Sequence, residues 1–220
     1  IKATVLDQYP NYLSPRTVEL RQQNLQSAEP NLRRFALISL AAFPPEEILP
    51  RAKPMLNDPV LAVRTEAINI LAPQYATLDA ATKQRFDQVM NEYLNIQRNM
   101  SDRPEGYMNQ GIIFASTGRV QEAEQIYLLG LKRFPKFTAL YANLADLYRG
   151  MGDDGKAGEL LQKGLELEPK NATLHYSQAL WYFRKKDLKA GMASLQKAIQ
   201  LNPSDAGATY ALAIAQHSNG

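Results

Sequence analysis

One glycine-rich segment resembles a motif that binds phosphate. Gly150–Ala157 reads Gly-Met-Gly-Asp-Asp-Gly-Lys-Ala, which lacks only the final Ser or Thr of a P-loop, the residue that would hold magnesium. A P-loop follows a strand and binds phosphate through its backbone N–H groups. Here the preceding residues are typical of a helix, and Asp153 and Asp154 would repel a phosphate. We therefore interpret this segment as a turn between two helices.

The titratable residues form no catalytic or metal-binding pattern either. His175 and His217 are the only histidines, and the chain has no cysteine, which excludes disulfides, thiolate metal sites and a cysteine nucleophile. Neighbouring carboxylates such as Glu46 and Glu47 point apart on a helix and make no acid–base pair. We expect His175 to pack inside the fold and His217 to be exposed at a helix end. The sequence predicts a protein that is not an enzyme, with no catalytic residue, cofactor or metal.

Charge and hydropathy exclude two classes of partner. Lys and Arg number 25 against 22 Asp and Glu, and the two signs alternate along the chain, so no basic face for nucleic acid is expected. No apolar run approaches the length that a membrane helix needs, so no membrane insertion is expected. With 45% hydrophobic residues the chain has ample material for a core, and the elements that build this core come next.

Prolines recur at a fixed spacing in the second half of the chain. Pro135, Pro169 and Pro203 lie 34 residues apart. If each proline is the thirty-second place of a unit, the units begin at Pro104, Thr138 and Ala172. Aromatic and small residues then repeat at fixed places, namely Tyr107, Tyr141 and His175 at the fourth, Gly111, Ala145 and Ala179 at the eighth, Phe114, Tyr148 and Tyr182 at the eleventh, Ala123, Ala157 and Gly191 at the twentieth, and Gly130, Gly164 and Ala198 at the twenty-seventh.

These places have physical roles in a pair of helices. Small residues let two helices approach closely, aromatic residues fill the space beside them, and a proline ends each unit because it cannot continue a helix. The pattern resembles the tetratricopeptide repeat, a helix–turn–helix unit of 34 residues that stacks into a solenoid. The resemblance implies an all-α, right-handed α-solenoid, with three full repeats and the first helix of a fourth in residues 102–220.

The first half of the chain is also expected to be helical. Asp58-Pro59 is followed by Val63-Arg64, Ala67 and Ile70-Leu71, which resembles the second helix of a HEAT repeat, and Glu29-Pro30 begins a looser copy. Generic antiparallel helices are the alternative. Pro50 and Pro54 should kink or interrupt the element between these copies. We predict a lead-in over residues 1–13, HEAT-like pairs over 14–76, a junction helix over 77–101 and the tetratricopeptide array after it.

Asparagines recur on the predicted concave face of the array, which the first helices line. Asn109 and Asn143 share the sixth place of successive repeats, and an amide can both donate to and accept from a peptide backbone. The alternative is that both asparagines serve only the fold or the solvent. The clamp for a terminal carboxylate that some family members use is absent, because Met108, Thr173 and Ser177 stand at its basic places.

The same face predicts a partly apolar groove for an internal protein segment or a helix. Our candidate peptide-binding residues are Asn109, Asn143, Met108, Ile112, Asp146, Arg149, Tyr176, Leu180, Phe183 and Arg184. We therefore expect a non-catalytic protein-interaction module whose partner is a protein or peptide.

A second resemblance implies an alternative function. Asn99–Glu105 and Ala142–Arg149, within this order of helices, are similar to the C-terminal part of certain bacterial multihaem c-type cytochromes. That resemblance implies an exported, periplasmic protein in which this chain is a docking scaffold for a haem domain; without it we expect a cytoplasmic protein. No Cys-x-x-Cys-His motif occurs here, so no haem-binding residue carries over, although His217 could reach a partner's haem.

The C-terminal end of the array is expected to be apolar. The fourth repeat has a first helix over Ala206–Ser218 that contains Tyr210, Leu212 and Ile214. A solenoid is normally finished by a helix with a polar outer face. We hypothesise that the chain is a piece of a longer protein or that this end self-associates with another copy.

Overall fold

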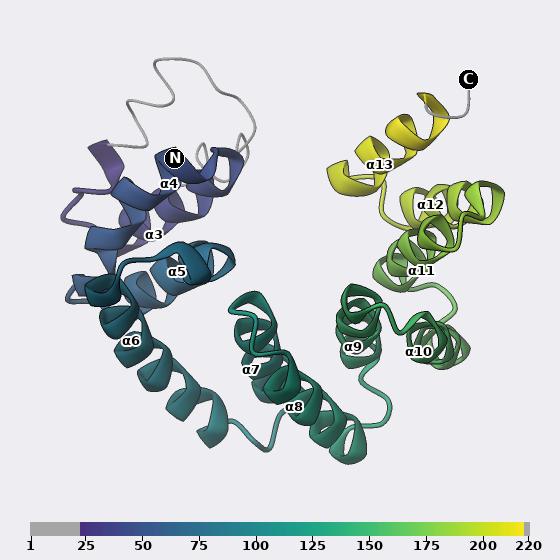
Figure 1. The fold of residues 1–220 in the computed structure, drawn as a ribbon, viewed down its shortest axis with the longest axis horizontal. Coiled ribbons are helices and arrows are strands. Elements are labelled where there is room, and N and C mark those ends of the chain that lie inside the picture. Colours follow the sequence, from purple (N-terminus) through teal and green to yellow (C-terminus); the bar gives the residue numbers. More distant parts are fainter. Residues whose placement is uncertain (1–22, 218–220) are drawn as a thin grey trace. The chain divides into compact units, whose positions relative to one another are not determined.

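The computed structural model describes residues 23–217, and every regular element in that range is a helix (Figure 1). The predicted all-α solenoid class is confirmed. The predicted lead-in of residues 1–13 and the first residues of the predicted HEAT-like segment, 14–22, lie outside the described residues. No helix of residues 23–217 is long and apolar enough to cross a membrane.

The chain divides into two compact units. Unit 1 contains the described residues up to Asn99 together with Ser116–Gly118, and unit 2 contains Met100–Ala115 and the residues from Arg119 onward. Each unit is described by itself below.

Unit 1 is a succession of short helices and one long helix. Its elements are α3 (Pro30–Ile38), η1 (Ser39–Ala42), α4 (Pro45–Ala52), η2 (Lys53–Asn57), α5 (Leu61–Leu71), η3 (Ala72–Thr77) and α6 (Ala80–Asn99). Prolines explain several boundaries, since α3 and α4 both begin at a proline, where the missing N–H costs nothing. Pro54 lies where α4 gives way to η2, which agrees with the predicted interruption, whereas Pro50 lies inside α4 and does not end it.

Two arginines of unit 1 share one arrangement. Arg33 Nη1 donates to the carbonyl oxygens five and six residues before it, at 3.1 and 2.8 Å, and Arg64 Nη1 does the same at 3.2 and 2.9 Å. Each then reaches a carboxylate further along the chain. Arg33 binds Asp58 through Nε and Nη2 at 2.6 and 2.9 Å, and Arg64 binds Glu92 through Nη2 at 2.6 Å. This repetition supports two copies of one motif, while their HEAT-like nature stays a prediction.

Unit 2 consists of successive helix pairs (Figure 1). The first helices are α7 (Pro104–Ser116), α9 (Thr138–Met151), α11 (Ala172–Arg184) and α13 (Ala206–His217), and the second helices are α8 (Val120–Arg133), α10 (Asp154–Leu167) and α12 (Leu188–Leu201). The backbone turns between the helices of a pair at the fifteenth place, where Gly118, Gly152 and Lys186 have φ of 78°, 83° and 63°. Glycine adopts this left-handed conformation without strain, so two of the three turns have the residue that suits them.

The small residues in unit 2 have the role predicted for them. A Cβ at Gly111 would overlap the ring of Tyr127, which is 2% exposed. A Cβ at Gly130 would lie 2.8 Å from both Tyr107 Cβ and Leu140 Cδ1. These glycines therefore let the second helix of a pair lie against the first helices on either side of it.

Candidate peptide-binding groove

The predicted asparagines lie on successive first helices. Asn109 is on α7 and Asn143 is on α9, and both are partly exposed. Asn143 Nδ2 donates to the Ala139 carbonyl oxygen of its own helix at 2.8 Å. One amide hydrogen of Asn143 is therefore engaged within α9, while its oxygen forms no hydrogen bond to the described residues. Met108 is partly exposed on α7, and Ile112 is 39% exposed on the same helix.

A polar cluster connects α9 and α11. Asp146 Oδ2 accepts from Ser177 Oγ at 3.0 Å, and Asp146 Oδ1 accepts from Arg149 Nε at 3.4 Å. Burial, together with the nearby charge of Asp146, raises the pKa of the Tyr127 hydroxyl above its ordinary value, so this group stays protonated at neutral pH. Asp146 and Arg149 are both predicted site residues. Through the bond from Ser177 of α11 to Asp146 of α9, they belong to a network that also connects two first helices.

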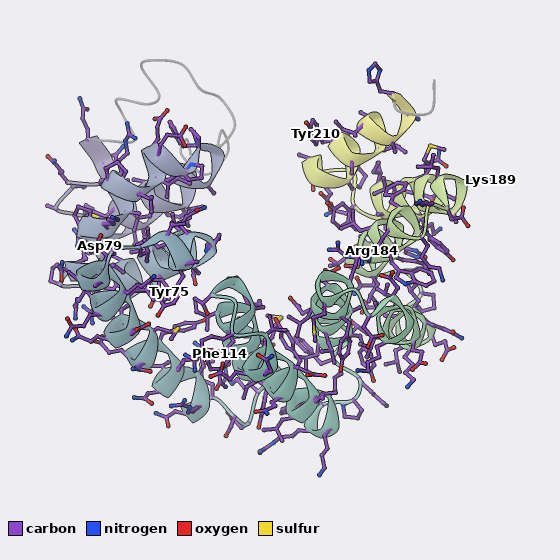
Figure 2. The ribbon with its side chains drawn as sticks, in the orientation of Figure 1. Tyr75, Asp79, Phe114, Arg184, Lys189 and Tyr210 are labelled. Carbon is purple, nitrogen blue, oxygen red and sulfur yellow. The ribbon has the colours of Figure 1, made fainter. Side chains whose placement is uncertain are left out.

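Arg184 lies at the end of α11, next to the turn of the preceding repeat (Figure 2). Its Nε donates to Asp154 Oδ1 at 2.7 Å, and Trp181 Nε1 donates to the Asp154 carbonyl oxygen at 2.7 Å. Asp154 therefore receives two donors from α11. Arg184 contributes to the contact between neighbouring repeats, a role that its place in the sequence did not indicate.

An apolar groove lies between α11 and α13. It has a volume of about 440 Å³. Its lining consists of Leu180, Phe183, Leu188, Tyr210, Ala211, Ile214 and Ala215. Leu180 and Phe183 are predicted site residues, and the structure brings them together with the exposed side chains of Tyr210 and Ile214. Tyr176 and Phe183 also pack on a buried cluster that includes Ala179 and Leu195, so both serve the fold as well.

Leu188 lines this groove but is not among the predicted residues. It is the first residue of α12, directly after Asp187, which caps that helix by accepting from the Ala190 N–H at 3.0 Å. Only residues of first helices were expected to line the groove, and Leu188 begins the second helix α12. The sequence feature that could have indicated Leu188 is an apolar residue directly after the helix cap Asp187. In the structure its side chain is 40% exposed.

The segment that resembles a P-loop is the predicted turn between helices. Gly152 ends α9, and Asp153 caps α10 by accepting from the Lys156 N–H at 3.1 Å. That hydrogen bond lowers the pKa of Asp153, so the side chain is anionic at neutral pH and opposes phosphate binding. The interpretation as a turn is confirmed.

The histidines show no site among the described residues. His175 is partly exposed, and its Nε2 lies 3.0 Å from the Pro169 carbonyl oxygen; Tyr141 makes the equivalent bond to Pro135 at 2.9 Å. At these two fourth places the side chain therefore binds the proline that ends the preceding repeat, and the predicted packing of His175 inside the fold stays a prediction. His217 is exposed at the end of α13. Residues 23–217 contain no group of three or more acidic or histidine side chains able to hold a metal ion.

Comparison with known families agrees with the repeat boundaries. Residues 138–171 and 172–205 each match the family described as Tetratricopeptide repeat. The family match covers these two units and no other part of the chain. Their bounds coincide with the second and third units predicted from the proline spacing, while the tetratricopeptide nature of residues 104–137 stays a prediction.

The chain was also compared with curated proteins and with solved structures. No curated protein matches the chain. A solved structure described as the first TPR of Spaghetti (RPAP3) bound to HSP90 peptide SRMEEVD aligns with a TM-score of 0.49 and 18% sequence identity, over 54% of this chain and 94% of that chain.

Proposed function

We propose that unit 2 is a non-catalytic protein-interaction module that binds a helix or peptide segment of a partner protein on its concave face. The observation that carries this proposal is the apolar groove between α11 and α13, where Leu180, Phe183 and Leu188 border the exposed side chains of Tyr210 and Ile214. Apolar pockets of this kind are where the anchor residues of a partner helix or peptide dock.

The tetratricopeptide repeats support the same function. Repeats of this type stack into extended surfaces that proteins use for binding. Asn109 on α7 and Asn143 and Arg149 on α9 add partly exposed polar groups on the first helices of the preceding repeats. Polar groups around an apolar centre are typical of protein interfaces. The alternative role, a docking scaffold for an exported haem domain, stays a prediction that no contact among residues 23–217 tests.

The first test changes the apolar groove. A partner captured by the wild-type chain and identified should bind the Leu180→Asp variant at least about tenfold more weakly, because an unpaired carboxylate would be buried in the contact. Leu167→Asp is the matched control, since Leu167 is a 46% exposed leucine on the second helix α10 and its change should leave the affinity unaltered. Circular dichroism would verify that both variants fold. Equal binding by the wild type and both variants would contradict the proposal that the partner binds in the apolar groove.

A second test distinguishes an extended peptide from a helix. The double variant Asn109→Ala/Asn143→Ala removes side chains that could bond to an extended backbone, whereas a helix satisfies its own backbone groups. Loss of binding in this variant, measured by calorimetry with the identified partner segment, would indicate an extended segment. Retained binding in the double variant, together with loss in Leu180→Asp, would indicate a helix.

A further inference from the structure

A second pocket of unit 2 lies between α10 and α11, which are neighbours in the array (Figure 1). It has a volume of about 390 Å³, which is within the range of sites that hold a ligand. Its lining includes Trp181 and Tyr182 of α11 and Gln162 and Glu166 of α10. No residue of this lining belongs to the apolar groove between α11 and α13, so the two sites are built from separate side chains.

The aromatic side of the pocket offers ring surface. The rings of Trp181 and Tyr182 have centroids 4.8 Å apart and are tilted by 55°, and both side chains are partly exposed. Trp181 Nε1 donates to the Asp154 carbonyl oxygen at 2.7 Å, which holds the indole ring in place and uses its single donor. The face of an aromatic ring attracts cations.

The polar side of the pocket offers hydrogen-bond acceptors. Gln162 Nε2 donates to Glu166 Oε1 at 3.0 Å, and this bond leaves Glu166 Oε2 and the Gln162 amide oxygen without a partner among the described residues. Glu166 is exposed and forms no ion pair within residues 23–217. A carboxylate accepts strong hydrogen bonds from a cationic donor. Acceptors beside aromatic rings therefore favour a cation in this pocket.

The earlier repeats show that the aromatic residue at the eleventh place receives a cation in this chain. That place holds Phe114, Tyr148 and Tyr182. Arg119 Cζ lies 4.6 Å from the ring centroid of the first, and Lys156 Nζ lies 4.7 Å from that of the second. Lys156 stands at the nineteenth place of its repeat, and Ala190 stands there in the next repeat. In the part of the chain that the structure describes, no lysine or arginine lies over the ring of Tyr182.

A second difference between the repeats leaves the pocket open. Tyr148 Oη donates to Glu124 Oε1 at 2.6 Å, and Glu124 stands at the twenty-first place of the preceding repeat. One repeat later that place is Gly158, and the Tyr182 hydroxyl forms no hydrogen bond to the described residues. A Cβ at Gly158 would lie 2.7 Å from Trp181 Cζ2. Glycine thus removes the carboxylate and lets the indole approach α10.

We propose that this pocket binds an arginine side chain of a partner protein. The guanidinium stacks on the ring of Tyr182, and its N–H groups donate to the Glu166 carboxylate and the Gln162 amide oxygen. Arginine suits the pocket better than lysine does, because its planar group stacks on a ring and presents five donors in a fixed arrangement. This contact goes beyond the proposed function of the apolar groove and does not depend on it.

The surroundings of the pocket favour a side chain of a protein over a free small molecule. Glu166 and Gln162 are both exposed, so the backbone that carries the arginine can leave the pocket towards the solvent. Lys185 Nζ lies 5.2 Å from the ring centroid of Trp181, so this cation of the chain lies over the neighbouring ring and leaves the ring of Tyr182 for the partner.

Tryptophan fluorescence of the whole chain tests the proposal, because Trp181 is the only tryptophan and lines the pocket. The probe is the capped peptide acetyl-Gly-Gly-Arg-Gly-Gly-amide, which should change the fluorescence with a Kd in the millimolar range, as a single side chain in an open pocket does. The same peptide with citrulline, a neutral analogue of arginine, should bind at least about tenfold more weakly. No response to the arginine peptide, or equal binding of both peptides, would overturn the proposal.

Two charge variants test the role of the carboxylate. Glu166→Gln should bind the arginine peptide at least about fivefold more weakly, since the hydrogen bonds from the guanidinium lose their charged acceptor. Glu105→Gln changes the net charge equally at an exposed position of α7 and should bind as the wild type does. Unchanged binding by Glu166→Gln would show that the arginine does not lie in this pocket.

A cation supplied from within the chain should compete with the peptide. Ala190→Lys gives Tyr182 the counterpart of Lys156, and it should weaken binding of the arginine peptide at least about threefold. Ala193→Lys adds the same charge at an exposed position of α12 and should leave binding unaltered. Circular dichroism would verify that the variants fold. Equal weakening in both lysine variants would indicate general charge repulsion and would contradict a site at Tyr182.

A small probe distinguishes the two sources of a guanidinium. Acetylarginine methylamide should bind no more tightly than the pentapeptide, because the flanking residues of the peptide lie outside the pocket. If acetylarginine methylamide changed the fluorescence and the pentapeptide did not, the pocket would hold a small cationic molecule, and the proposed contact with a protein would be wrong.

Discussion

Lys186 occupies a backbone conformation that side chains with a Cβ rarely adopt. Its φ of 63° matches the φ of Gly118 and Gly152 at the same place of the two preceding repeats. The left-handed conformation costs a residue other than glycine roughly 1 kcal/mol. We predict that Lys186→Gly raises the free energy of unfolding by about 1 kcal/mol or slightly less, since glycine also gains entropy in the unfolded chain. Urea denaturation measures the change. Lys185→Gly is the control, because Lys185 has φ −75° and should gain nothing.

The buried ion pair of Arg33 and Asp58 predicts a dependence of stability on pH. Burial alone would raise the pKa of Asp58. The opposing effects are larger, so the pKa lies below its ordinary value: Arg33 and the Val60 N–H donate hydrogen bonds to the carboxylate, and Arg33 and Arg64 are positively charged. A lowered folded-state pKa means that the pair stabilises the fold fully above about pH 4 and loses this effect as the pH falls through the folded-state pKa.

The variant Asp58→Asn tests this dependence. At pH 7 it should lower the free energy of unfolding by roughly 3–5 kcal/mol, because it leaves Arg33 buried without its carboxylate. The difference from the wild type should narrow as the pH falls below about 4. Glu46→Gln, at an exposed position of α4, should change stability by less than about 0.5 kcal/mol at any pH. If the difference in free energy of unfolding between the wild type and Asp58→Asn stayed constant between pH 7 and pH 2.5, the ion pair would not be the source of the pH dependence.

At the scale of helices, two glycines with opposite surroundings predict opposite effects. A Cβ at Gly111 would overlap the Tyr127 ring, while a Cβ at Gly150, in the last turn of α9, would meet no atom within 4 Å. Gly111→Ala should therefore destabilise unit 2 by about 1–3 kcal/mol, as overpacking of a helix contact does. Gly150→Ala should stabilise it by up to about 1 kcal/mol through helix propensity. Thermal unfolding of the two variants should shift in opposite directions, and a shift of the same sign would show that Tyr127 moves aside without cost.

At the scale of the repeat array, stability should fall towards α13. In a stacked array each repeat contacts its neighbours alone. Ala208 of α13 packs in a buried cluster with Ala179, Leu195 and Ala198, while the other side of α13 is exposed. We predict that amide hydrogens of α13 exchange at least about tenfold faster than those of α9 and α10 in a dilute sample. Hydrogen exchange followed by mass spectrometry measures this. Equal protection in α9, α10 and α13 would contradict the predicted gradient of stability.

The repeating part of the fold was predictable from sequence because its determinants are local and periodic. The proline spacing gave the bounds of both matched repeats, and the small residues at the eighth and twenty-seventh places predicted the close helix contacts seen at Gly111 and Gly130. The same periodicity placed Leu180 and Phe183 among the candidate peptide-binding residues, and both line the apolar groove between α11 and α13. Whether Asn109 and Asn143 bind a partner stays a prediction.

By itself, then, the sequence determined the helical class and the 34-residue repeat, because these depend on residues within one helical pair. Only the tertiary structure decided which distant side chains meet: Arg33 with Asp58, Arg184 with Asp154, and Leu188 with Tyr210 around one groove. These contacts join residues more than 20 places apart, and they depend on how each helix is rotated and displaced against the next.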